Sequence, residues 1–98
     1  MSKVIDAEGT QIAAIRRHLN FRDRRVLEIG CGDGRLTLDI AREATSVLAV
    51  DPNAAEIATA RATLPPDLAD TVTYSVGSAG DFEIPRSSID LVFFSWSL

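Results

Sequence analysis

The 98-residue sequence has little cysteine, few positive charges and no long hydrophobic run. Its single cysteine, Cys31, excludes an internal disulfide and is typical of a reducing compartment. No apolar stretch approaches the roughly 18 residues that span a membrane. Asp6 and Glu8 interrupt the N-terminus where a signal peptide would be apolar. These absences predict a cytoplasmic protein of one domain with no membrane partner.

Positive charge is concentrated in residues 16–25, although Lys and Arg together number only 10 against 14 acidic residues. This stretch is compatible with a nucleic-acid patch or with the solvated end of a helix, where cations favour the helix dipole. We favour the helix end, because Asp23 interrupts the run and the formal net charge is -4. Nucleic acid is therefore not an expected partner.

The N-terminal segment predicts one helix after a short lead-in. Residues 1–8 have the pattern of an irregular lead-in. From about residue 10 to 19, apolar side chains recur at a helical spacing, at Ile12, Ile15 and Leu19. We therefore expect residues 1–23 to pack as a helical segment on the rest of the domain.

A glycine-rich turn follows the first buried strand. Val26–Ile29 is a short apolar run typical of such a strand, and glycines follow at positions 30, 32 and 34. The apolar spacing then predicts a helix over about residues 34–43, with Asp33 able to cap it. Strand, glycine turn and helix is the layout that aims backbone N–H groups at a ligand. Glycine suits the turn because a Cβ would keep the ligand away from the backbone.

The spacing of these glycines excludes two phosphate-binding motifs. The dinucleotide fingerprint G-x-G-x-x-G would need glycine at position 35, where the chain has Arg35, and the Lys-Ser/Thr pair of a phosphate-binding loop is absent. The chain instead reads E-x-G-x-G-x-G, led by Glu28. An acid beside the turn suits a cationic ligand better than a phosphate. A purely structural role, in which the turn lets a helix pack closely on a strand, stays open.

The rest of the chain predicts three more strands and one more helix. Val47–Val50 and Ile89–Phe94 are apolar runs typical of buried strands, and Val72–Val76 alternates as a half-buried strand does. An Ala-rich helix begins near residue 54, with Asp51 as its cap and Pro52 in its first turn. Alternating strands and helices predict an α/β fold with a parallel, doubly wound sheet.

Ligands bind such sheets beyond the C-terminal ends of the strands. The glycine turn, Asp51, the loop at residues 77–81 and Ser95 all follow strand ends. We therefore expect these four segments to converge on one edge of the sheet and to form the ligand site.

The motifs resemble those of the class I S-adenosylmethionine-dependent methyltransferases. Besides E-x-G-x-G-x-G, residues 77–81 (G-S-A-G-D) resemble the family's G-D-A-E-D loop, and residues 89–92 (I-D-L-V) resemble its F-D-L-V strand. Residues 95–98 (S-W-S-L) are similar to the S-x-x-L-H-H segment of small-molecule methyltransferases of the ubiquinone-biosynthesis type. The resemblance covers about residues 24–98. It implies a three-layer, Rossmann-like sheet truncated to four strands in the order 3-2-1-4, as one methyltransferase domain over residues 1–98.

The resemblance also implies the ligands and the site. The cofactor would be S-adenosyl-L-methionine, with S-adenosyl-L-homocysteine as product and a small molecule as methyl acceptor. Glu28 would help to hold the cofactor's amino group, and the glycines would lie under its methionine part. Asp51 would accept both ribose hydroxyls, since a carboxylate accepts two donors at once. Asn53 would face the adenine, and Ser78 stands where the family has an aspartate for the adenine amino group.

The full set of expected cofactor-binding residues is Glu28, Gly30, Cys31, Gly32, Gly34, Asp51, Pro52, Asn53, Ser78, Ala79 and Ser95. No general base is identified, and Asp33, Asp81 and His18 are candidates by residue type only. His18 has no Cys, Asp or second His at a ligand spacing, so no metal site is expected.

The resemblance predicts self-association as well. The family fold has seven strands, so four strands would leave Ile89–Phe94 as an unpaired edge and one sheet face bare. An apolar edge of this kind pairs with another chain, which predicts a homo-oligomer through the fourth strand. Two alternatives to a methyltransferase stay open. One is a non-catalytic cofactor-binding or assembly subunit that retains the fold, and the other is an aminopropyl-type transferase on the same scaffold.

Overall fold

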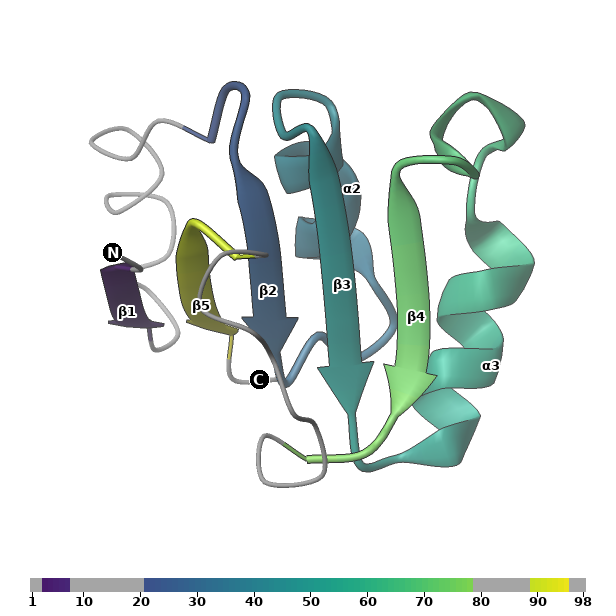
Figure 1. The fold of residues 1–98 in the computed structure, drawn as a ribbon. Coiled ribbons are helices and arrows are strands. Elements are labelled where there is room, and N and C mark those ends of the chain that lie inside the picture. The colour runs from purple at the N-terminus through teal and green to yellow at the C-terminus, as the bar shows by residue number, and fades with distance from the viewer. Residues whose placement is uncertain (1–2, 8–20, 79–88, 96–98) are drawn as a thin grey trace.

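The computed structural model of the protein describes residues 3–7, 21–78 and 89–95, which form one five-stranded sheet (Figure 1). All neighbouring strands pair in parallel, in the order β1-β5-β2-β3-β4. The strands are β1 (Lys3–Ala7), β2 (Arg25–Ile29), β3 (Ser46–Asp51), β4 (Val72–Val76) and β5 (Leu91–Ser95). The helices are α2 (Arg35–Ala41), α3 (Ala54–Thr63) and the 3-10 helix η2 (Pro66–Leu68). The predicted order of the four strands β2 to β5 is confirmed.

Both described α-helices pack on one face of the sheet, α2 against β3 and α3 against β3 and β4 (Figure 1). The core between them is apolar, and Phe21 meets Phe93 edge-to-face at 6.0 Å between ring centroids. Its largest members from strands and helices are Val26, Ile40, Val47, Ile57, Tyr74, Leu91 and Phe93. Burial of these side chains is the main force that holds the helices on the sheet.

The opposite face of the sheet also carries apolar side chains, as expected for a parallel sheet covered on both sides. Leu27, Ile29, Val50 and Ile89 form a second cluster, and each is at most 9% exposed. The expectation of a bare face is therefore wrong at the centre of the sheet.

The edge beside β5 is occupied by β1, with Lys3 opposite Leu91 and Ala7 opposite Ser95. β5 therefore lies between β1 and β2, and the expectation of an unpaired fourth strand is wrong. The irregular lead-in expected at residues 1–8 is likewise replaced by a strand over Lys3–Ala7. A five-residue strand whose partner lies at the other end of the chain gives no local signal of its pairing. The unpaired edge and the bare face from which an oligomer through the fourth strand was predicted are therefore not found at β5 and at the centre of the sheet.

Two helix starts differ from the sequence prediction. Asn53, not Asp51, caps α3, because its side-chain oxygen accepts from the amides of Ala55 at 2.9 Å and Glu56 at 3.2 Å. Pro52 lies before the helix. At α2 the capping position is Gly34, which has no side chain for the purpose.

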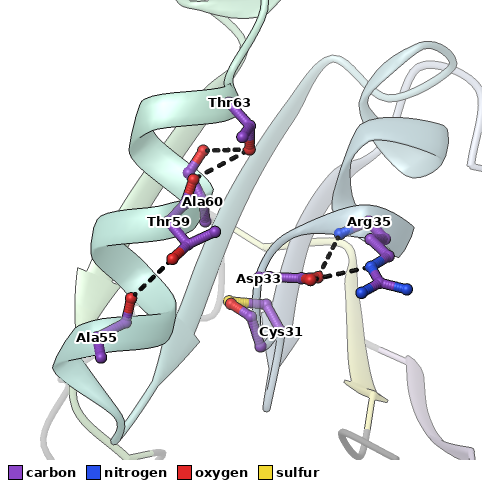
Figure 2. Close-up of polar contacts among 8 residues, drawn as sticks. Cys31, Asp33, Arg35, Ala55, Thr59, Ala60 and Thr63 are labelled. Atoms are coloured by element: carbon purple, nitrogen blue, oxygen red, sulfur yellow. Dashed lines mark hydrogen bonds and ion pairs between the residues drawn. The ribbon is translucent and has the colours of Figure 1, made fainter.

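Asp33 precedes the cap of α2 and binds Arg35 instead. Its carboxylate accepts from the Arg35 amide at 3.4 Å and from the guanidinium Nε at 2.9 Å (Figure 2). The figure also shows two threonines of α3, Thr59 and Thr63, whose hydroxyls donate back to carbonyls of their own helix. These polar groups are therefore satisfied by local partners and are not directed at a ligand.

A bidentate ion pair fixes the start of β5 beside β2. The Arg25 guanidinium donates to both carboxylate oxygens of Asp90, at 3.1 Å from Nε and 3.0 Å from Nη2. The two backbone amides add a bond each: the Arg25 amide donates to the Asp90 carboxylate and the Asp90 amide donates to the Arg25 carbonyl, both at 2.8 Å. The Arg25 guanidinium lowers the pKa of Asp90 to about 2.

The helix expected at residues 10–19 lies outside the described residues, as does most of the 77–88 loop. Within the described part of the chain, neither α-helix has the length and apolar character needed to cross a bilayer.

Candidate functional site

The turns that follow β2, β3 and β4 are hydrogen-bonded to one another at one edge of the sheet. The amides of Gly30 and Cys31 donate to the Val50 carbonyl at 2.8 and 3.1 Å, which joins the first two turns. The Gly77 amide donates to the Asp51 carbonyl at 3.0 Å, which adds the third. The predicted convergence of these strand ends is confirmed.

Asp51 lies at the centre of this edge. Its side chain is 6% exposed, and its two oxygens accept from different turns: Oδ2 from the Gly32 amide and Oδ1 from the Asn53 amide, both at 2.9 Å. The carboxylate and the glycine turn are therefore in direct contact, although 19 positions separate Asp51 from Gly32. Each oxygen keeps a second lone pair for another donor.

Gly34 shows why the turn needs glycine. Its φ is 88°, in the left-handed region that disfavours a side chain. A Cβ added there would also collide with the hydroxyl of Tyr74 on β4. Gly30 and Gly32 also have positive φ, at 82° and 57°. The backbone can therefore curl tightly over the end of β2 and lead directly into α2.

The amides of the glycine turn are used inside the protein. Gly30, Cys31 and Gly32 donate to Val50 or Asp51, and Gly34 donates to the Cys31 carbonyl at 3.1 Å. The expectation that these N–H groups aim at a ligand is therefore wrong for these four residues. With these amides engaged, the turn is poorly suited to cradle a phosphate, which agrees with the missing phosphate motifs.

Glu28 lies beneath the turn and is fully buried. The Thr37 hydroxyl of α2 donates to its Oε1, and Oε2 has no hydrogen-bond partner among the described residues. Burial raises the pKa of Glu28 to about 7; the hydroxyls of Thr37 and Ser95 oppose the rise, and the Asp51 carboxylate adds to it. A carboxyl in this position is close to balance between its neutral and charged forms near neutral pH.

Cys31 and Tyr74 remain neutral beside this carboxyl. Burial raises the pKa of the Cys31 thiol to about 12 and that of the Tyr74 phenol also to about 12. A thiol that stays protonated is a poor nucleophile, so Cys31 serves here as a small apolar side chain.

The other expected site residues are distributed around this edge. Pro52, Asn53 and Ser78 are exposed next to Asp51 and Gly77, and Ser95 is buried at the end of β5. Ala79, His18 and Asp81 lie outside the described residues. The sequence reasoning missed Thr37 and Tyr74. Thr37 follows the turn by one helical turn, a spacing that could have placed its hydroxyl over Glu28.

The geometry can be compared with known proteins. A model of the methyltransferase domain family matches residues 26–98, well over half of the chain. The chain belongs to this methyltransferase family. The resemblance inferred from the E-x-G-x-G-x-G turn is thereby confirmed.

Two curated methyltransferases are similar in sequence. The magnesium-protoporphyrin O-methyltransferase of Rhodobacter capsulatus is 40% identical over 57 residues, which cover 58% of this chain and 25% of that protein. The mitochondrial ubiquinone biosynthesis O-methyltransferase of Schizosaccharomyces pombe is 39% identical over 69 residues, covering 68% and 25%. The chain thus spans about a quarter of the length of the curated relatives it matches.

A solved methyltransferase shares the fold. The S-adenosylmethionine-dependent methyltransferase from Mesorhizobium loti superposes with a TM-score of 0.75 at 26% identity, over 88% of this chain and 39% of that one. The methyltransferase domain of this chain therefore has the Rossmann-like architecture predicted from the sequence.

Proposed function

We propose that this methyltransferase domain binds S-adenosylmethionine at the edge formed by Asp51 and the glycine turn and takes part in methyl transfer to a small molecule. The observation that carries the proposal is the contact between the Asp51 carboxylate and the Gly32 amide. It joins the two features that the family resemblance assigns to opposite ends of one ligand, the ribose and the methionine part.

The chemistry of the residues fits such a ligand. S-adenosylmethionine carries an ammonium and a sulfonium cation, and the buried acids at this edge, Glu28 and Asp51, have no ion-pair partner among the described residues. The unpartnered Oε2 of Glu28 can accept from an ammonium group, directly or through water. The turn amides, in contrast, are satisfied internally, which disfavours a phosphate ligand.

S-adenosylmethionine supplies, when bound, a methyl group on a positively charged sulfur. The protein's own residues then bind, orient and exclude water. Asp51 would hold the ribose through its free lone pairs, and Glu28 would balance the ammonium charge. Gly30 and Gly32 would let the ligand lie against the backbone. We name no general base, because Asp33 already binds Arg35.

The acceptor class is inferred from relatives. The two similar curated proteins are named for magnesium-protoporphyrin and for ubiquinone biosynthesis, both small molecules. We therefore propose a small-molecule acceptor for this domain, methylated on oxygen. Cytoplasmic residence stays a prediction from the sequence.

A non-catalytic subunit that binds the cofactor is the second candidate. The observation that favours it is that Asp33, the candidate base nearest the glycine turn, is already bound to Arg35. Calorimetry with S-adenosylhomocysteine tests ligand binding, which both candidates require. A methyl-release assay with a panel of hydroxylated aromatic acceptors then separates them, because only the enzyme consumes S-adenosylmethionine in an acceptor-dependent way. Absence of binding would remove both candidates.

A further inference from the structure

One residue joins all three turns at the candidate site. The backbone carbonyl of Asp51 accepts from the Gly77 amide after β4, and its carboxylate accepts from the Gly32 amide after β2 and from the Asn53 amide before α3. Every donor and acceptor in these bonds belongs to the chain itself. Asp51 therefore has a structural function at this edge in addition to the ribose contact inferred above.

We propose that Asp51 is a positioning residue, which holds the Gly30–Gly34 turn in its binding conformation before the ligand arrives. This inference rests on the proposed function and deepens it. It assigns Asp51 an influence on parts of the ligand that it does not touch, because the turn beneath the methionine part keeps its shape through the Asp51 carboxylate.

The backbone of the turn explains why such a tie is needed. Gly30, Gly32 and Gly34 all have positive φ, and glycine has more alternative conformations than any other residue. The turn therefore has little intrinsic preference for the conformation observed. Gly32 is buried, and its amide would lose its partner if the Asp51 carboxylate were removed, which is unfavourable for a buried donor.

The positioning and the ribose contact are compatible. Each carboxylate oxygen has two acceptor lone pairs, and each oxygen uses one of them to accept from a backbone amide in the structure. One lone pair on each oxygen is left for a ribose hydroxyl. The same side chain can thus shape the turn and bind the ligand, with no rearrangement between the two states.

A comparison of two ligands separates the two functions. One ligand is S-adenosylhomocysteine and the other is its 2′,3′-dideoxy analogue, which has no ribose hydroxyls for Asp51 to accept. A residue that acted only through the ribose would leave the affinity for the dideoxy analogue unchanged in Asp51→Asn. If Asp51 also positions the turn, the same variant weakens binding of the dideoxy analogue by about tenfold, the size of one hydrogen bond to a charged group.

The matched control is Asp70→Asn, an exposed acid at the opposite end of β4 that should leave both affinities unchanged. Unchanged binding of the dideoxy analogue to Asp51→Asn would overturn the proposal, while the proposed function would stand. Failure of the unmodified protein to bind S-adenosylhomocysteine would instead remove the proposed function.

A measurement on the unmodified protein without ligand tests the inference even if Asp51→Asn does not fold. Amide hydrogen exchange of the unmodified, ligand-free protein should show the Gly32 amide protected, because it donates to a buried carboxylate. Exchange of Gly32 at the rate of an unstructured peptide would overturn the proposal. In a folded Asp51→Asn variant only one acceptor oxygen remains for the amides of Gly32 and Asn53, so we expect faster exchange at one or both of them, with protection in β2 and β3 retained.

Discussion

Replacement of Glu28 by glutamine should change how the stability of the domain depends on pH. Glu28 is fully buried, and burial raises its pKa from 4.5 to about 7. The folded protein therefore binds a proton more tightly at Glu28 than the unfolded chain does. Between pH 4.5 and about 7 the folded state carries more protons, so the stability must fall as the pH rises through this window. Above about pH 7 the stability that protonated Glu28 contributes is fully lost.

The size of the effect follows from the shift. A pKa difference of roughly 2.5 corresponds to on the order of 3 kcal/mol between the protonated and ionised limits. Glutamine has nearly the shape of a protonated glutamic acid and can still accept from the Thr37 hydroxyl. Glu28→Gln should thus match the unmodified protein near pH 4.5 and exceed its stability by up to about 3 kcal/mol at pH 8.

Urea unfolding followed by circular dichroism, at pH values from 4.5 to 8, measures this difference directly. Cys31 and Tyr74 do not titrate in this range, because their pKa values are both raised to about 12. Thr37→Val is the matched control, since it removes the hydroxyl but retains the acid and hence the pH dependence. Parallel stability curves for the unmodified protein and Glu28→Gln would refute the reasoning.

Three further perturbations test other parts of the structure. Because Arg25 lowers the pKa of Asp90 to about 2, the pair should stabilise the fold above pH 4 and lose this effect as the pH falls toward 2. In Asp90→Asn the free energy of unfolding should therefore depend less on pH between about 4 and 2. An unchanged pH dependence would contradict the pairing. Gly34→Ala should lower the free energy of unfolding by at least about 1 kcal/mol in urea titrations. Addition of Tyr74→Phe to this variant should recover part of the loss, because it removes the hydroxyl that the new Cβ meets. No loss in Gly34→Ala would contradict the positive φ and the close contact at this position. Removal of residues 1–7 should expose the edge of β5 and promote self-association in light scattering, whereas an unchanged mass would show that β1 does not protect this edge.

The sequence predicted those parts of the fold that depend on local patterns. The apolar runs and glycines located β2 to β5 and both helices, and the rule for parallel sheets placed Asp51 beside Gly32. The spacing of the glycines also excluded phosphate motifs, in agreement with the internal use of the turn amides.

The features that the sequence did not predict depend on contacts between distant segments or on competition between neighbours. β1 pairs with a strand at the far end of the chain, so its five residues gave no sign of it. Asp and Asn are both common helix caps. Asn53 caps α3, whereas the Asp51 carboxylate accepts from the Gly32 amide. Tyr74 reads as an ordinary strand residue, and only the folded structure places its hydroxyl against Gly34.

The central claim is that Asp51 and the glycine turn hold one nucleoside–amino-acid ligand between them. A crystal structure of this chain with S-adenosylhomocysteine tests it most directly. We predict that the ribose hydroxyls donate to the Asp51 carboxylate while the homocysteine part lies over Gly30–Gly34, with the bond between Asp51 and Gly32 retained. A ligand seated elsewhere, or one whose ribose does not reach Asp51, would contradict the account.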